Sequence, residues 1–253
     1  MKFISKNILF VLSLTAIALL SSFTLKGYIK EENKDTIWLY VTYPDKKIDY
    51  YLEVSIDGSV LMREKNAKSV VVREGTIKKM YAKDFFRETK NSDIMAYSKN
   101  IDISKMLFFK GELVKISANI KGEIIRVVSP LNMFSNTFIY AFRQVYDEAI
   151  KLPETKKYVS FIYAAPMNTD LYNDFFKKVP ANYEIPVVET KELKLNKYIF
   201  RAVNYPWRLI PIPSDDEENT ISDFMSSYNL YGLKSSFYLG TTRGKFQLSI
   251  VEN

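Results

Sequence analysis

The sequence contains neither histidine nor cysteine among its 253 residues. Without histidine, it lacks the usual general base of serine and cysteine catalytic triads and the side chain that titrates near neutral pH. Without cysteine, it has no disulfide, no thiol nucleophile and no cysteine for lipid attachment of the lipoprotein kind. The missing residue types also argue against a structural zinc site, because such sites use cysteine and histidine as ligands.

Glycine is scarce as well. The chain has 8 glycines, which are too dispersed to build a loop that cradles phosphate groups. It also lacks the G-x-S-x-G and S-x-x-K motifs of serine enzymes. These absences disfavour nucleotide chemistry and serine catalysis, and we predict that the protein uses no cofactor.

Paired carboxylates are the chemistry that remains, because glycoside cleavage needs only two suitably spaced acids. Asp170 and Asp174 would share one face of a predicted helix, but nothing distinguishes them from ordinary surface charge. The acidic run at residues 215–218 lacks the spacing and the glycine of an EF-hand loop, which favours a solvated helix N-terminus over a calcium site. The sequence therefore predicts no catalytic residue and no metal site.

The first 25 residues have the order of a secretory signal. Lys2 and Lys6 precede an apolar run at residues 8–20. The uncharged stretch at residues 7–25 is also long enough to span a bilayer as a helix. Residues 1–25 are therefore either a cleaved signal peptide or a retained membrane anchor. Both alternatives place the rest of the chain outside the cytoplasm, as a periplasmic, secreted or membrane-tethered domain.

Residues 26–253 have the composition of a globular domain, because the chain as a whole is 47% hydrophobic and 15% aromatic. The net charge is +7. Its basic residues are mostly lysine and are scattered along the chain, which argues against nucleic-acid binding. An exported domain without disulfides is more typical of a bacterial envelope than of eukaryotic secretion.

Alternating apolar residues predict antiparallel strands in the first half of the chain. The alternation begins at residues 37–41 and continues through two hairpins, with predicted two-residue turns at residues 57–58 and 121–122. Helices are predicted at residues 76–88 and 131–152. The second helix carries an apolar stripe at spacings of three to four residues, which predicts a buried face. The stripe consists of Phe134, Phe138, Phe142, Val145 and Ala149.

The second half uses the same kinds of element. We predict strands at residues 158–164, 185–190 and 197–204, helices at residues 168–178 and 219–231, and a closing hairpin at residues 235–251. Residues 208–212 are either an edge strand or an extended connector. Together with the first half, these elements predict an α+β fold. It would consist mainly of antiparallel sheet, with three or four helices packed on one face, after the N-terminal hydrophobic segment.

A division of residues 26–253 into two halves, 36–152 and 153–253, is a further prediction. Its support is a short repeat, in which Asp-Phe-Phe is followed by a basic residue at residues 84–87 and again at 174–177. A chance match between two amphipathic helices is the alternative.

Tyr205, Trp207 and Arg208 form the best candidate binding surface in the sequence. Aromatic faces bind sugars and peptides with little loss of conformational freedom. Trp207 follows Pro206 closely and precedes further prolines, which stiffen its backbone, and Arg208 adds a polar group. Packing of Trp207 beneath the loop is the alternative.

The export signal and the missing catalytic residues together favour a non-enzymatic envelope protein that binds a protein partner or a polymer, or that holds a place in an assembly. A carboxylate-dependent hydrolase of envelope polysaccharide is the alternative, and two facing acids in a cleft would support it. A third hypothesis is assembly through an exposed strand at residues 197–212.

Cell fractionation tests the predicted localisation outside the cytoplasm. We expect the chain to be found outside the cytoplasm, because its first 25 residues combine a basic start with an apolar centre. Release by osmotic shock would indicate cleavage, and retention in the membrane fraction after alkaline extraction would indicate an anchor. Recovery of the chain in the cytoplasm would contradict the prediction.

Overall fold

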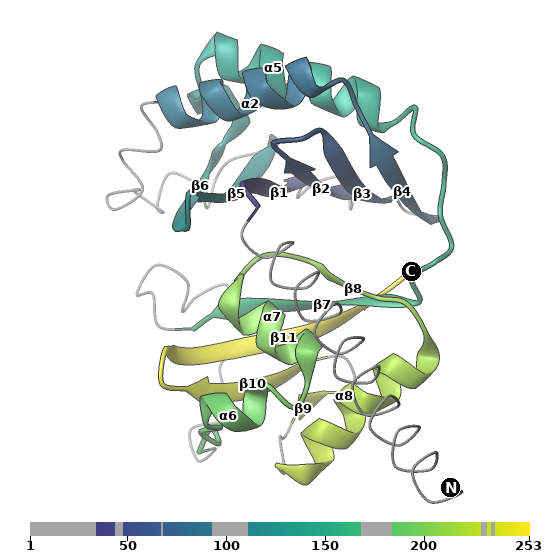
Figure 1. Cartoon of the computed structure of the whole chain (residues 1–253), viewed down its shortest axis with the longest axis vertical. Coiled ribbons are helices and arrows are strands. Elements are labelled where there is room, and N and C mark those ends of the chain that lie inside the picture. The colour runs from purple at the N-terminus through teal and green to yellow at the C-terminus, as the bar shows by residue number, and fades with distance from the viewer. Residues whose placement is uncertain are drawn as a thin grey trace, which may run out of the picture.

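Two antiparallel β-sheets, each with its own helices, form the structure (Figure 1). The computed structural model describes residues 34–43, 48–66, 68–92, 111–167, 184–228, 232–233 and 236–253. The α+β class with mainly antiparallel sheet is confirmed. The described part of the chain contains five α-helices, which are divided between the two sheets instead of covering one face.

The first sheet, sheet A, has six strands in the order β4-β3-β2-β1-β5-β6. Two long helices cover one of its faces (Figure 1). In chain order, the elements of this half are β1 (Thr36–Tyr43), β2 (Ile48–Ser55), β3 (Ser59–Lys65), β4 (Val70–Thr76), α2 (Lys79–Asn91), β5 (Leu113–Ile120), β6 (Glu123–Pro130), the 3₁₀ turn η1 (Leu131–Met133) and α5 (Asn136–Ala149).

The apolar stripe predicted for the second helix is buried between α5 and sheet A. All five of its side chains have relative exposures of 4% or less. The helix itself begins at Asn136, later than predicted, because the hydroxyl of Ser135 accepts a hydrogen bond from the Phe138 N–H and caps the first turn. The stripe thus packs α5 onto sheet A, as its spacing indicates.

The second sheet, sheet B, has five strands in the order β8-β7-β11-β10-β9. Its apolar cluster packs against three helices. In chain order, the elements of this half are β7 (Ser160–Pro166), α6 (Thr190–Leu193), α7 (Lys197–Asn204), β8 (Ile210–Ile212), α8 (Asp215–Ser227), β9 (Gly232–Leu233), β10 (Ser236–Thr241) and β11 (Gly244–Glu252). β8 lies at the sheet edge, as predicted for this proline-bounded segment.

Two predicted strands of this half are wrong. Residues 197–204 form helix α7, because the Asn196 side chain caps the N–H groups of Tyr198 and Ile199. Its buried residues recur with helical spacing, which the aromatic and β-branched composition concealed. Residues 185–190 make only a single bridge, between Val187 and Gly240, before α6 begins. Helix α8 also begins earlier than predicted, so that the acids at residues 215–218 form its first turn.

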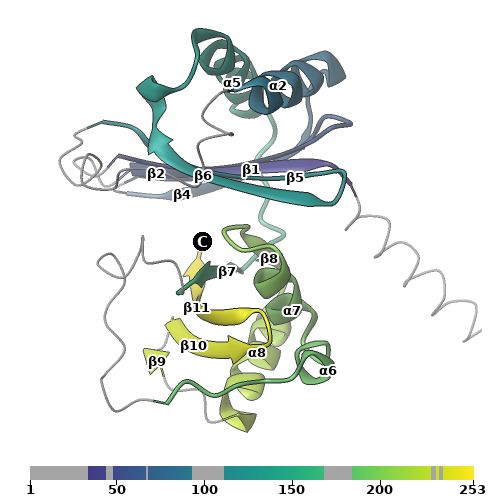
Figure 2. The ribbon, with the colours of Figure 1, turned by 90° about the vertical axis from the view of Figure 1, so that its left-hand side faces the viewer.

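The face of sheet A that lacks helices packs against sheet B. Figures 1 and 2 show that β7 and β8 are the strands of sheet B closest to this face. Aromatic residues from both sheets meet there in a third apolar cluster, which includes Trp38, Tyr51, Phe161 and Trp207. We call this region the interlayer junction. Sheet A is therefore buried on both faces.

An arginine and the last strand also join the two layers. Arg63 on β3 is 1% exposed, donates a hydrogen bond of 2.7 Å from Nη2 to the carbonyl oxygen of Glu252 on β11, and lies over the Phe161 ring. The adjacent Asn253 side chain donates to the carbonyl oxygen of Tyr158 at 2.6 Å. The end of β11 is thus held in the junction.

Several predictions concern residues outside the described part of the chain. They are the signal or anchor at residues 1–25, the helix at residues 168–178, the second copy of the short repeat at residues 174–177, and the acids Asp170 and Asp174. Among the residues that the structure does describe, no helix has the length and apolarity needed to cross a membrane. The division into halves at residue 152 stays a prediction.

Gly58 should be more sensitive to substitution than Gly122, although each occupies a hairpin turn with positive φ, at 96° and 85°. A Cβ at residue 58 would lie 2.6 Å from the carbonyl oxygen of Ile77, whereas a Cβ at residue 122 would meet nothing within 4 Å. We expect Gly122→Ala to cost about 1–2 kcal/mol from backbone strain alone, and Gly58→Ala to cost about 1–3 kcal/mol more. Urea unfolding of the two variants measures the difference, and equal losses would contradict it.

Candidate functional site

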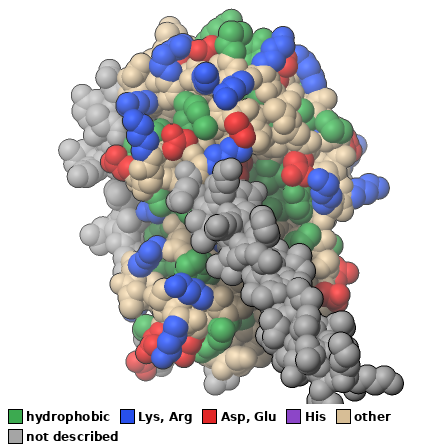
Figure 3. All heavy atoms as spheres, viewed as in Figure 1, with side chains coloured by type: hydrophobic (Ala, Val, Ile, Leu, Met, Phe, Trp, Pro, Cys, Tyr) green, Lys and Arg blue, Asp and Glu red, His purple; other side chains and the backbone are tan. Residues whose placement is uncertain are grey.

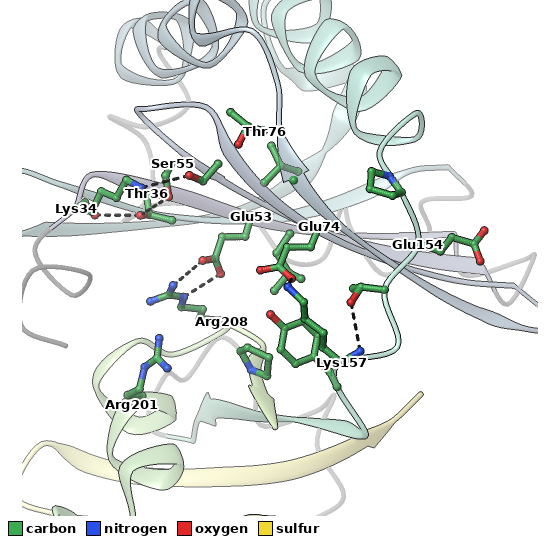
Figure 4. Close-up of a pocket in the computed structure, with 18 residues that line it drawn as sticks. Lys34, Thr36, Glu53, Ser55, Glu74, Thr76, Glu154, Lys157, Arg201 and Arg208 are labelled. Carbon is green, nitrogen blue, oxygen red and sulfur yellow. Dashed lines mark hydrogen bonds and ion pairs between the residues drawn. The ribbon is translucent and has the colours of Figure 1, made fainter. Parts of the chain in front are cut away.

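A polar cleft of about 640 Å³ opens at one end of the interlayer junction (Figure 4). Sheet A forms one wall through β1, β2, β3 and β4, and the other wall comes from residues 153–155, residues 157–158, α7, Arg208 and β8. The volume lies in the range of small-ligand sites in proteins, roughly 300–1,000 Å³. The cleft is therefore a candidate site for a ligand.

The register of sheet A places three rows of side chains on the face that lines the junction. The outermost row contains Thr76, Ser59, Ser55 and Thr36. The next row contains Glu74, Leu61, Glu53 and Trp38, and the third contains Val72, Arg63, Tyr51 and Tyr40. Because successive residues of a strand point to opposite faces, the apolar residues between them face the helices. The cleft thus lies over polar side chains next to an apolar cluster.

Glu53 forms a bidentate ion pair with Arg208 across the junction. Arg208 Nε donates to Glu53 Oε2 at 2.9 Å and Nη2 donates to Oε1 at 2.5 Å, while the Tyr51 hydroxyl donates to Oε2 at 2.6 Å. Both charged side chains are only 12% exposed. The pair joins β2 of sheet A to the segment that leads into β8, so it connects the two layers directly (Figure 4).

The backbone after α7 directs Arg208 toward Glu53. Trp207 has a φ of 71°, which non-glycine residues rarely adopt, and its N–H donates to the carbonyl oxygen of Ala164 at 2.9 Å. The Arg208 N–H donates to the carbonyl oxygen of Tyr205 at 3.1 Å, which closes the turn. Packing in the junction holds this strained turn in place.

Aromatic rings surround the Arg208 guanidinium. Its centre lies 5.8 Å from the Trp38 ring centroid and 5.6 Å from that of Tyr205. The two rings meet edge to face, with centroids 6.1 Å apart, and Trp38 Nε1 donates to the carbonyl oxygen of Pro206 at 3.3 Å. The rings exclude water from the ion pair and add cation–π attraction.

Electrostatics keep Glu53 ionised. Burial alone would raise the pKa of its carboxyl group, but the charge and hydrogen bonds of Arg208, the Tyr51 hydroxyl and the charge of Arg201 together hold that pKa below its ordinary value. The pKa of Arg208 is raised by Glu53 despite its own burial. Burial and the Glu53 charge raise the pKa of Tyr51, which stays protonated and able to donate.

Exposed ion pairs line the rim of the cleft. Lys157 Nζ lies 3.0 Å from Glu74 Oε2, and Arg73 Nη2 lies 3.0 Å from Glu154 Oε1. Lys34 pairs with Asp57 near the β2–β3 turn. Surface pairs of this kind contribute about 0–1 kcal/mol each, so removing one partner of a rim pair should cost less than removing one partner of the buried pair.

The three residues predicted as a binding surface lie together in the junction. Tyr205 and Trp207 pack in its apolar cluster, where Trp207 is 8% exposed, and Arg208 lines the cleft. Their role in binding stays a prediction. The sequence analysis missed Glu53, Tyr51 and Trp38, which the fold brings to the same place. Large aromatic residues at positions 38, 40 and 51, on the strand face expected to be solvated, were the available signal.

The remaining candidate acids lie elsewhere. Asp215 to Glu218 form the first turn of α8, where Glu217 Oε1 pairs with Lys197 Nζ at 3.1 Å. No group of three or more acidic side chains suited to a metal ion occurs within the described ranges. Comparison with known proteins gives no relative from which to assign the cleft a role: no protein-family model and no curated protein sequence matches the chain.

Glu53→Gln should destabilise the protein by about 3–5 kcal/mol at pH 7, because it leaves the buried Arg208 charge without its counter-ion. The lowered pKa of Glu53 gives the effect a pH dependence. The difference between the wild type and the variant should be complete above the pKa of an unfolded glutamate, about 4.3, and should disappear as the pH falls below it through the folded pKa. Urea unfolding across pH 3–7 measures both effects.

Glu74→Gln is the matched control. Glu74 pairs with Lys157 across the same cleft, but the lysine is 68% exposed, so we expect a loss of no more than about 1 kcal/mol. Similar losses for the two variants would show that the buried pair does not hold the layers together.

Proposed function

We propose that the chain is an exported, non-enzymatic envelope protein that binds a protein partner or a polymer in the cleft between its two layers, or holds a place in an assembly. Residues 1–25 serve as the signal peptide or membrane anchor, and residues 26–253 function outside the cytoplasm. The observation that carries the proposal is the set of hydrogen bonds that the Glu53 carboxylate accepts. Glu53, the least exposed acid of the cleft, accepts three hydrogen bonds from Arg208 and Tyr51.

The interactions of Glu53 argue against its acting as the general acid of a glycosidase in this cleft. Its two carboxylate oxygens accept three hydrogen bonds from Arg208 and Tyr51, which uses its best-aligned lone pairs. A glycosidase needs one carboxyl group with a raised pKa to protonate the leaving group. The pKa of Glu53 is shifted in the opposite direction. The acid is thus suited to holding the layers at a fixed distance.

A rigid, open cleft with polar walls suits the binding of an extended polar segment. The ion pair, Trp38 and Tyr205 fix the two walls relative to each other. A preformed site loses little entropy when it binds, so modest polar contacts suffice for recognition. The predicted surface at Tyr205, Trp207 and Arg208 contributes to this function by shaping the cleft, with Arg208 at its wall.

The alternative is a carboxylate-dependent hydrolase of envelope polysaccharide. Its support is that Glu53 and Glu74 both project from sheet A toward the cleft (Figure 4). In that case Glu53 would be the ionised base or nucleophile and Glu74 the acid. Both groups are ion-paired with basic side chains, so the binding function is the better supported of the two.

Binding without turnover is the expected behaviour of the purified protein mixed with isolated, insoluble envelope material. Lys157→Trp should weaken retention at least tenfold, because Lys157 lines the cleft and a larger side chain there would obstruct it. Lys156→Trp is the control, since Lys156 is exposed and does not line the cleft. Sedimentation measures the bound fraction, and an assay of newly formed reducing ends measures cleavage.

Two outcomes would contradict the proposal. Equal retention of both tryptophan variants would place binding outside the cleft. Release of reducing ends that is abolished in Glu74→Gln would establish the hydrolase alternative.

A further inference from the structure

Short hydroxyl side chains form a continuous row along the floor of the cleft. The row crosses four strands of sheet A and consists of Thr76 on β4, Ser59 on β3, Ser55 on β2 and Thr36 on β1. In the strand register, Thr76 lies opposite Ser59 and Thr36 lies opposite Ser55. All four line the cleft. Because neighbouring strands lie about 4.8 Å apart, the row presents polar groups at a regular interval across the strands. A ligand that lies along the row would meet a repeated set of contacts.

The row presents mainly hydrogen-bond acceptors. The hydroxyl of Thr36 donates to the carbonyl oxygen of Lys34 at 3.0 Å, and that of Ser59 donates to Asp57 Oδ1 at 2.9 Å. Each hydroxyl has one proton and two lone pairs. Lys34 Nζ already donates to the Ser59 hydroxyl at 3.4 Å, and the Ser55 hydroxyl lies 3.4 Å from that of Thr36, to which it can donate. Thr36 and Ser59 therefore keep one acceptor position each, and Ser55 keeps two. A ligand that fits the row must therefore supply O–H or N–H donors.

Most charges of the cleft are paired within the protein. Glu53 pairs with Arg208, Glu74 with Lys157, Glu154 with Arg73, and Lys34 with Asp57. Arg201 also lines the cleft, and its charge acts on Glu53. An ionic ligand that used any of the paired charges would have to separate a pair. An uncharged ligand would not, so the charge pattern favours a neutral one.

Apolar surface lies opposite the row. Tyr158 and Pro211 belong to the wall of the cleft opposite sheet A. Sugar rings have hydroxyl groups at their edges and apolar C–H faces, and aromatic rings offer such faces a rigid surface with little loss of entropy. Acceptors on one wall and rings on the other match both parts of a sugar.

We propose that the cleft binds a neutral polysaccharide chain, which lies across the strands of sheet A with its hydroxyl groups donating to Thr36, Ser55, Ser59 and Thr76 and with a sugar face against Tyr158. The inference rests on the proposed binding function and specifies its ligand. A phosphate-containing polymer and a charged peptide are the competing ligands, and both are disfavoured by the internal compensation of charge.

Titration calorimetry of the purified protein with neutral tetrasaccharides tests the inference. The probes are a tetramer of β-linked glucose and a tetramer of β-linked N-acetylglucosamine. At least one should bind, and Thr76→Val should weaken its binding at least threefold, because valine keeps the shape of threonine and removes the acceptor. Thr36→Val combined with Thr76→Val should weaken it at least tenfold.

Thr42→Val is the matched control. Thr42 lies on the same strand as Thr36 but does not line the cleft, so its replacement should leave the affinity unchanged. Thr76 is exposed, and its variant should fold even if Thr36→Val reduces stability. Tyr158→Leu provides an independent readout, because it removes the ring without touching the hydroxyl row, and it should also weaken binding at least tenfold.

The outcomes separate this inference from the proposed function. If neither tetrasaccharide binds, while Lys157→Trp still abolishes retention on envelope material, the ligand is not a neutral glycan and the binding function stands. Binding that is equal in the wild type and in the doubly substituted protein would also overturn the inference. If the protein binds neither the sugars nor envelope material, both proposals fail.

Discussion

The buried ion pair between Glu53 and Arg208 determines how the two layers fit together. Each charge would be costly to bury alone, and each is stabilised only by the other and by the hydrogen bonds around them. The pair therefore restricts the layers to the arrangement in which the fork of the guanidinium meets the two carboxylate oxygens. Apolar packing alone tolerates small slides of one surface over another, and a bidentate pair does not. The form of the cleft depends on this restriction.

The hairpins of sheet A could be predicted because their information is local. Alternation of apolar and polar residues sets the strand face, and Lys121-Gly122 forms the predicted two-residue turn between β5 and β6. The loop between β2 and β3 has three residues, one more than predicted, because Gly58 itself adopts a positive φ after two preceding loop residues. The apolar stripe could be predicted equally well, since its helical spacing leaves one buried face; Phe134 precedes α5, and the other four residues lie on it.

Helix α7 and the interlayer junction could not be predicted from the local sequence in the same way. The composition of residues 197–204 suits a strand, and the deciding contact is the cap from Asn196, which also donates to the carbonyl oxygen of Thr220 far along the chain. Glu53 looks like an ordinary solvated residue of an alternating strand. Its burial depends on a partner that is 155 positions away. Long-range pairs of this kind carry no signal in a short window of sequence.

The burial of sheet A on both faces also explains the aromatic content of the chain. Helices α2 and α5 cover one face with phenylalanine, and the junction covers the other with tryptophan and tyrosine, whose polar atoms find partners there. A junction that mixes aromatic rings with paired charges is rigid and leaves a polar opening at its end. Candidate site and structural core are thus continuous, and Arg208 belongs to both.

The hydrogen bond from Arg63 to the carbonyl oxygen of Glu252 has a consequence for the order in which the protein is completed. The two residues are separated by 189 positions, so a ribosome finishes the donor long before the acceptor. The six described strands of sheet A are complete once residue 130 is made. Arg63, Glu53 and the aromatic rings on its junction face then still lack their partners from the second half of the chain. The contact between Arg63 and Glu252 can form only after the final strand is made. A passage across the membrane before folding would give both sheets the chance to meet as a complete pair.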